Sequence, residues 1–177
     1  MTFQMSSVNY DTENDIIDNK DDSVICLTFS TTLRFDNLIE VIIKLVRLIE
    51  INENKQIERL NIVLSSDIEL AKLNSKYRNI YGPTDVLTFN LTDDFDESKL
   101  NTQNTQTAIG ISGDIYISAD RVIAQSIERS VEPKDEFLHL LAHGLLHLFG
   151  WTHEDDVSLS KIIQTGEKYI TMSYHGN

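Results

Sequence analysis

The chain has 177 residues, enough for one domain with a sizeable core, and its contents of 41% hydrophobic and 24% charged residues are ordinary for a globular protein. It has no apolar run of about 18 residues or more, which excludes a membrane-spanning helix. Its net charge of −13 argues, taken alone, against a nucleic-acid-binding protein, because phosphate neutralisation supplies most of that affinity.

The first part of the chain is acidic and lacks hydrophobic periodicity. Residues 1–22 are rich in Asp, Asn and Ser and contain six acids against only Lys20, so they are predicted to form a disordered tail. The remainder, residues 23–177, is predicted to be one domain. A second acidic stretch, residues 92–107, is predicted to be a loop. The only cysteine, Cys26, cannot form an internal disulfide, which fits a reducing compartment.

Strands and helices are predicted from residue 23 onward. Hydrophobic alternation and β-branched residues predict strands at residues 23–30, 57–65, 85–91 and 113–118. Helical spacing of apolar residues predicts helices at residues 36–50 (with Asp36 as the candidate cap), 66–77, 120–130, 133–149 and 157–172. Pro133 fits the first turn of the longest helix, and Gly150 ends it. Together these elements predict an α+β fold around a small mixed sheet of four strands.

The most informative stretch of the chain contains four of its five histidines within 15 residues. His143 and His147 are four residues apart on the predicted long helix, so both rings project from one face and can meet one metal ion. An open catalytic site requires a third protein ligand. The alternative is that these histidines are satisfied by hydrogen bonds on a half-buried helix, but their number and spacing favour the metal site.

Two histidines compete to be the third ligand. His139 lies one turn upstream, but about 12 Å separates it from His147 along the helix axis, so these two and His143 cannot easily converge on one ion. Gly150 lets the chain leave the helix and double back, which brings His153 over the same position. We therefore predict that His143, His147 and His153 bind one divalent ion, with His139 in a supporting position.

The spacing of these histidines also matches metzincin proteases, apart from one residue. Those enzymes have a Glu directly after the first histidine as the general base, whereas this chain has Gly144. The substitution disfavours peptide hydrolysis, although an acid from elsewhere in the chain could replace the missing carboxylate. The residues alone thus predict a metal-dependent hydrolase.

Three motifs in chain order narrow this prediction. HGLLHLFGWTH stands at residues 143–153, PTDVLTF at residues 83–89 shortly after Arg78, and GDIYIS at residues 113–118. Together they resemble the YbeY family, the metal-dependent endoribonucleases of bacterial ribosomal RNA maturation. The resemblance covers about residues 24–174. It departs at Thr152, where the family usually has Asp, a change that bears on the orientation of His153.

The resemblance implies a mixed four-stranded sheet with a zincin-like metal helix, one zinc-like ion, and cleavage of single-stranded RNA. It further implies a role in the maturation of 16S (small-subunit) rRNA and in ribosome quality control, in the cytoplasm, with the ribosomal subunit and ribosome-associated proteins as partners and no membrane. Arg78 would be the cleft arginine that grips a phosphate and offsets the charge developing there. Whether the attacking group is water or the RNA 2′-hydroxyl stays open, as does the contact of Asp85 and Asp114 with the cleft.

Three functions therefore remain from the sequence. The first is an endoribonuclease, the second is a metal-dependent hydrolase of another substrate such as a peptide, and the third is a metal-binding or ribosome-associated factor without catalysis. Gly144 disfavours the peptidase. Exposed positive charge near Arg78, Lys76 and Arg121 would favour RNA over a site without catalysis.

Overall fold

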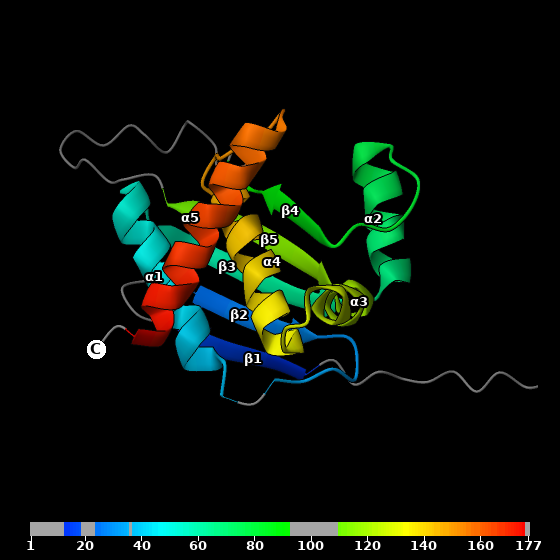
Figure 1. Cartoon of the computed structure of the whole chain (residues 1–177), viewed down its shortest axis with the longest axis horizontal. Coiled ribbons are helices and arrows are strands. Elements are labelled where there is room, and N and C mark those ends of the chain that lie inside the picture. The colour runs from blue at the N-terminus through cyan, green and yellow to red at the C-terminus, as the bar shows by residue number, and fades with distance from the viewer. Residues whose placement is uncertain (1–12, 19–23, 36, 93–109, 176–177) are drawn as a thin grey trace, which may run out of the picture.

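The computed structural model describes residues 13–18, 24–35, 37–92 and 110–175 (Figure 1). Within these ranges the chain is an α+β protein, as predicted. The strands are β1 (Glu13–Asp18), β2 (Val24–Phe29), β3 (Ile57–Ser65), β4 (Val86–Asn90) and β5 (Ile111–Ser118). The helices are α1 (Ile39–Glu53), α2 (Asp67–Arg78), α3 (Ala119–Arg129), α4 (Pro133–Leu148) and α5 (Asp156–His175).

The strands form one mixed sheet in the order β1-β2-β3-β5-β4. The three central strands β2, β3 and β5 are parallel, while β1 and β4 pair antiparallel with their neighbours at the two edges. Strand β4 is thus an edge strand, and one of its long sides is not paired with another described strand. This edge borders the candidate site.

The sheet has five strands, one more than predicted, and the additional strand lies in the segment predicted to be disordered. Strand β1 pairs with β2 in a register that places Glu13 opposite Phe29 and Ile16 opposite Cys26. Because an edge strand is held mainly by backbone hydrogen bonds, it can form without the alternating pattern on which the prediction relied. The other residues of 1–22 lie outside the described residues, as do residues 93–107 of the predicted acidic loop and the predicted cap Asp36.

Helices α2, α3 and α4 agree with the predicted ranges to within one residue at each end. Helix α1 instead begins and ends three residues later than predicted, with Leu38 and not Asp36 as its N-cap, and α5 ends three residues later. The Ser66 side chain accepts a hydrogen bond from the Glu69 amide and caps α2, and Pro133 occupies the first turn of α4. Asp155 accepts a hydrogen bond from the Ser158 amide just before α5 begins, which accounts for the acids that follow His153. Local capping chemistry therefore sets these ends.

Helices α1, α4 and α5 lie over one face of the sheet in Figure 1, and their apolar side chains share one core with the strands. Helix α4 packs against α3, α5, β4 and β5, so it is central to the molecule. None of the helices in the described ranges is long and apolar enough to cross a membrane. The buried position of α4 fixes the backbone that carries three of the histidines.

Candidate metal centre

Helix α4 exposes only one stripe of side chains after its first turn. From Glu136 to Leu148 every residue is buried except His139, His143 and His147, which are half-buried. Leucines and one phenylalanine fill most of the remaining positions of the helix. A helix buried on most of its surface cannot easily shift or rotate, so the three imidazoles have well-defined directions.

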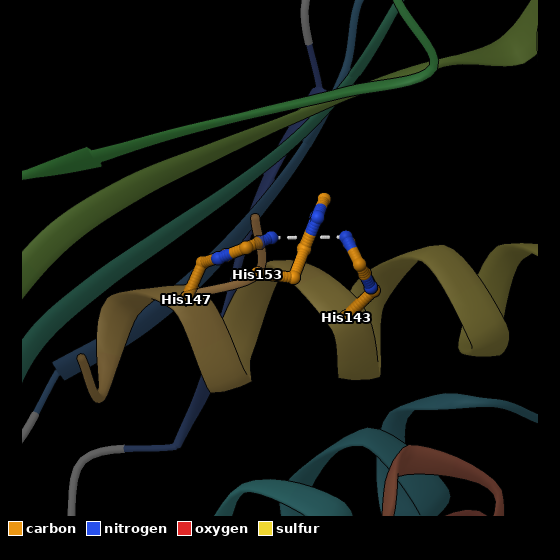
Figure 2. A group of neighbouring side chains, drawn as sticks. All are labelled: His143, His147 and His153. Carbon is orange, nitrogen blue, oxygen red and sulfur yellow. Dashed lines mark hydrogen bonds between the residues drawn. The ribbon is translucent and has the colours of Figure 1, made fainter. Parts of the chain in front are cut away.

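Two of these histidines and a third from the following turn converge, as Figure 2 shows. The Nε2 atoms of His143 and His147 are 2.9 Å apart, and one ligand nitrogen from each of His143, His147 and His153 lies within 4.8 Å of the other two. Tetrahedral coordination with metal–nitrogen bonds of about 2.0–2.1 Å separates such nitrogens by about 3.3 Å. The three nitrogens therefore fit a metal ion after small side-chain movements.

His153 reaches the site because the chain reverses directly after α4. Gly150 has φ +99°, a conformation that residues with a Cβ rarely adopt, and the Trp151 amide donates to the carbonyl of Leu146. Two side chains at the end of α1 and just after it hold this turn: Lys55 Nζ donates to the Phe149 carbonyl at 2.8 Å, and Glu53 accepts from the Trp151 indole at 2.9 Å. The turn is thus tied to the fold on both sides of Gly150.

The same turn determines which nitrogen of His147 carries a proton. His147 Nδ1 lies 2.8 Å from the Trp151 carbonyl oxygen. A carbonyl can only accept, so Nδ1 is protonated and the lone pair of His147 is on Nε2, which faces His143. This is the tautomer and the outer contact typical of a metal-binding histidine.

Burial also keeps these imidazoles uncharged. Burial, and after it the neighbouring His147 and His153, lower the pKa of His143 to about 4. Burial likewise lowers the pKa of His147. Both rings are therefore neutral at physiological pH, as metal ligands must be.

His139 lies outside the group of three. It lines the same cleft one turn upstream, but it does not belong to the set of converging ligand atoms. Burial, followed by the charge of Arg129, lowers its pKa. His139 therefore lines the cleft beside the three converging histidines.

The histidines open into a cleft of about 910 Å³ between α4, α3, β4 and the start of α5. Arg78, at the end of α2, lines this cleft and forms no hydrogen bond or ion pair with any residue in the described ranges. Arg129 lines it too, but binds the buried carboxylate of Glu136 at 2.8 Å. Arg78 is therefore the cleft arginine whose guanidinium is available to a ligand.

The two aspartates whose positions the sequence left open lie in different places. Asp85 lines the histidine cleft, where its two oxygens accept from the Val86 amide and the Gln125 side chain. Asp114 lines a second cavity, on the other face of β4. Thr152, at the position where an Asp was expected, lines the cleft and is exposed.

Three further residues that line the cleft were not predicted from the sequence. Gln125 and Arg129 come from α3, and Glu136 from the start of α4. Glu136 is 1% exposed, and burial raises its pKa despite the neighbouring Arg129. No local motif marks these residues, and the amphipathic pattern of α3 indicates only which of its faces is buried.

The packing around Gly144 shows why this position has no side chain. A Cβ there would lie 2.9 Å from Ile115 Cγ2, 3.1 Å from Val86 Cγ2 and 3.2 Å from Thr88 Oγ1. Such separations are too short, so α4 can approach β4 and β5 only with glycine at this position. A zincin-type carboxylate directly after His143 would require α4 or these side chains to move.

Comparison with known proteins gives a consistent result. The family model described as Endoribonuclease YbeY matches residues 17–174. Curated relatives with the same description include proteins of Neorickettsia sennetsu, 36% identical over 104 residues, and of Prochlorococcus marinus subsp. pastoris, 37% identical over 113 residues. These alignments cover 59% and 63% of this chain, and 64% and 59% of the relatives, so the chain spans less than two thirds of their length.

A solved structure shares the fold. The solution structure of a protein from Thermotoga maritima aligns with a TM-score of 0.53 and 24% identity, over 85% of this chain and 89% of that one. The family match spans β2 to β5, the five helices except the last residue of α5, and the three histidines. The chain belongs to the YbeY endoribonuclease family.

Proposed function

We propose that this protein is a metal-dependent endoribonuclease that cleaves single-stranded RNA during 16S rRNA maturation and ribosome quality control in the cytoplasm. The observation that carries the proposal is the open cleft in which three histidines stand near an arginine without a partner among the described residues. Family membership supports the substrate class. The 16S rRNA of the small subunit and ribosome-associated proteins are the proposed partners.

The proposed cofactor is one Zn²⁺ ion held by His143, His147 and His153. Three neutral imidazoles with a remaining open position are the donor set of many catalytic zinc sites. When bound, such an ion supplies Lewis acidity, which makes a nucleophile available near neutral pH and draws charge from phosphate oxygens. The contact between His147 and the Trp151 carbonyl keeps the His147 lone pair directed at the site.

Arg78 is the proposed catalytic residue of the chain itself. Its guanidinium, which has no partner within the described ranges, can form two parallel hydrogen bonds with a phosphodiester, and it keeps its charge at every relevant pH. Attack on phosphorus increases the negative charge on the non-bridging oxygens, so a fixed cation at this place stabilises the transition state more than the ground state. The other arginine of the cleft, Arg129, is already neutralised by Glu136.

Peptide hydrolysis is the second candidate, because the histidine spacing is that of a metzincin. The tight packing at Gly144 argues against it, since the chain has no carboxylate at the position of the general base and a side chain there would force its neighbours to move. The half-buried Asp85 also lines the cleft, but its oxygens already accept hydrogen bonds from Val86 and Gln125. RNA cleavage therefore agrees better with the geometry.

The test compares metal-loaded protein on a labelled single-stranded RNA and on an unstructured peptide. We expect RNA cleavage that His143→Ala abolishes. Arg78→Ala should lower kcat by roughly 10²- to 10³-fold, the effect of losing one charge-stabilising donor, and raise KM less. Arg78→Lys should recover little, because an ammonium cannot reproduce the planar fork.

Arg121→Ala is the matched control, since Arg121 is held by Asp67 and does not line the cleft. It should leave both kinetic constants unchanged. Cleavage of the peptide but not of RNA would transfer the proposal to the second candidate. Stoichiometric metal binding without cleavage of either substrate would instead indicate a metal-binding factor without catalysis.

A further inference from the structure

A second cavity, of about 490 Å³, lies on the opposite face of the edge strand β4 from the histidines. Successive side chains of β4 point to opposite faces of the sheet. Thr88 faces α4, where its hydroxyl donates to the Gly144 carbonyl, so the neighbouring Phe89 faces the other side. Arg78, Thr88 and Asn90 line both cavities, so the two meet at this edge.

Three aromatic rings form the wall of the second cavity, which we call the aromatic pocket. Tyr77 contacts Phe89 at a centroid distance of 5.3 Å and an angle of 68°, and Phe89 contacts Tyr116 at 5.9 Å and 82°. Edge-to-face packing of this kind does not cover the faces of all three rings. None of the three belongs to the buried core, and Tyr77 is 57% exposed.

The charges around the aromatic pocket are separated. Inside it, Asp114 accepts a hydrogen bond from the Asn61 amide group at 2.6 Å. At its edge, Arg78 is without a partner in the described ranges, and Lys76 lies over the Tyr77 ring at 4.8 Å. A phosphate inside the pocket would approach Asp114, whereas a neutral base would not. The charges thus favour a base inside the pocket and a phosphate at its edge.

We propose that the aromatic pocket binds one nucleobase of the RNA, stacked on Tyr77, while Arg78 holds the adjoining phosphate at the entrance to the histidine cleft. This inference rests on the proposed function, because it assigns a subsite to the same substrate. Bases of single-stranded RNA stack on exposed aromatic side chains, and double-stranded RNA does not offer its bases in this way. The pocket therefore also accounts for a preference for single strands.

The competing explanation is that the rings only attach α2 to the sheet. That role would make the pocket matter for stability and not for RNA. The exposure of Tyr77 separates the two explanations, since a side chain exposed by more than half contributes little to packing. Its replacement should leave the fold intact, which thermal unfolding can verify.

The experiment measures kcat and KM for Tyr77→Ala, Tyr77→Phe and the control Tyr81→Ala on a short single-stranded RNA. Tyr81 is 91% exposed and does not line the aromatic pocket. We expect Tyr77→Ala to raise KM by about fivefold or more, the lower range for one stacked base, with a smaller change in kcat. Tyr77→Phe keeps the ring and should restore KM, and Tyr81→Ala should have the wild-type value.

A series of RNAs with one abasic nucleotide at successive positions then locates the subsite. At one position near the cleaved bond, the missing base should raise KM in wild type and Tyr77→Phe, but cause no further rise in Tyr77→Ala. A wild-type KM for Tyr77→Ala, or losses that add at every position, would overturn the inference while RNA cleavage itself stands. Absence of RNA cleavage by the wild type would instead overturn the proposed function, and the subsite with it.

Discussion

His143, His147 and His153 differ in how firmly the fold holds them. The first two project from the buried helix α4, and His147 is oriented by the Trp151 carbonyl. His153 is exposed and lies two residues beyond Trp151, whose indole donates to Glu53. Because a less constrained ligand loses more entropy on binding, its contribution to metal affinity should be the most variable of the three.

We predict that His143→Ala or His147→Ala abolishes stoichiometric zinc binding, and that His153→Ala weakens it strongly. His139→Ala should retain nearly one ion per chain, because His139 lies outside the converging group. Elemental analysis after dialysis measures the occupancy, and titration calorimetry measures the affinity. Full occupancy in the double variant H143A/H147A would mean that the ion binds elsewhere. Loss of the ion in His139→Ala, with His153→Ala unaffected, would exchange the roles of those two residues.

The sequence predicts that His143, His147 and His153 come together, because their spacing along and after one helix and the glycine that ends it are local features. Whether the Arg78 side chain is paired with an acid could not be predicted in this way. Whether an arginine is paired depends on how separate elements pack: Arg129 of α3 binds Glu136 of α4, and Arg121 of α3 binds Asp67 of α2. The motif predicts that Arg78 lies in the cleft, and only the fold shows that its guanidinium has no partner among the described residues.

The contact between α4 and the sheet is closest at Gly144, directly beside the first histidine. Replacing a helical glycine by alanine normally stabilises a protein by about 1 kcal/mol, because alanine has the higher helix propensity. Here the new methyl would meet Ile115, Val86 and Thr88 at 2.9–3.2 Å. We predict that Gly144→Ala lowers the free energy of unfolding by about 1–3 kcal/mol, the typical cost of overpacking a core. Denaturant unfolding measures it.

Gly166→Ala in α5 provides the matched control. Its added Cβ would lie 3.3 Å from the Ala142 Cβ and 3.9 Å from Leu146, with no strand close by. We expect a much smaller loss, or a gain from helix propensity. If Gly144→Ala were as stable as wild type and bound metal normally, α4 would have room to move from the sheet, and the steric argument against a carboxylate at this position would fail.

The helices and central strands are predictable because each carries its own signal. Ser66, Pro133 and Gly150 mark helix ends, and the β-branched strands alternate or are continuously apolar. Strand β1 lacks such a signal and depends on its partner, so the sequence predicts four strands where the sheet has five. The aromatic pocket likewise joins α2, β4 and β5, and no single element indicates it.

The net negative charge of the protein opposes the binding of its proposed substrate. The chain carries −13, and the described residues that line the histidine cleft include only two arginines and no lysine. Arg129 is paired with Glu136, and its other terminal nitrogen lies 3.7 Å from Glu167. Few phosphates can therefore be neutralised, and affinity must come mainly from the metal site and from stacking.

This balance predicts a weak dependence of RNA binding on salt. For single strands, the logarithm of the binding constant falls with the logarithm of salt concentration with a slope of about −0.7 per neutralised phosphate. With Arg78 and Lys76 as the cations near the substrate path, we expect a slope between about −0.7 and −1.5 for a short RNA. Arg78→Ala should make the slope shallower by about 0.7, and Arg121→Ala should leave it unchanged. Fluorescence anisotropy of a labelled RNA over a range of salt concentrations measures it. A slope steeper than about −3 would mean that the RNA follows other basic residues and not the path from the aromatic pocket to the histidines.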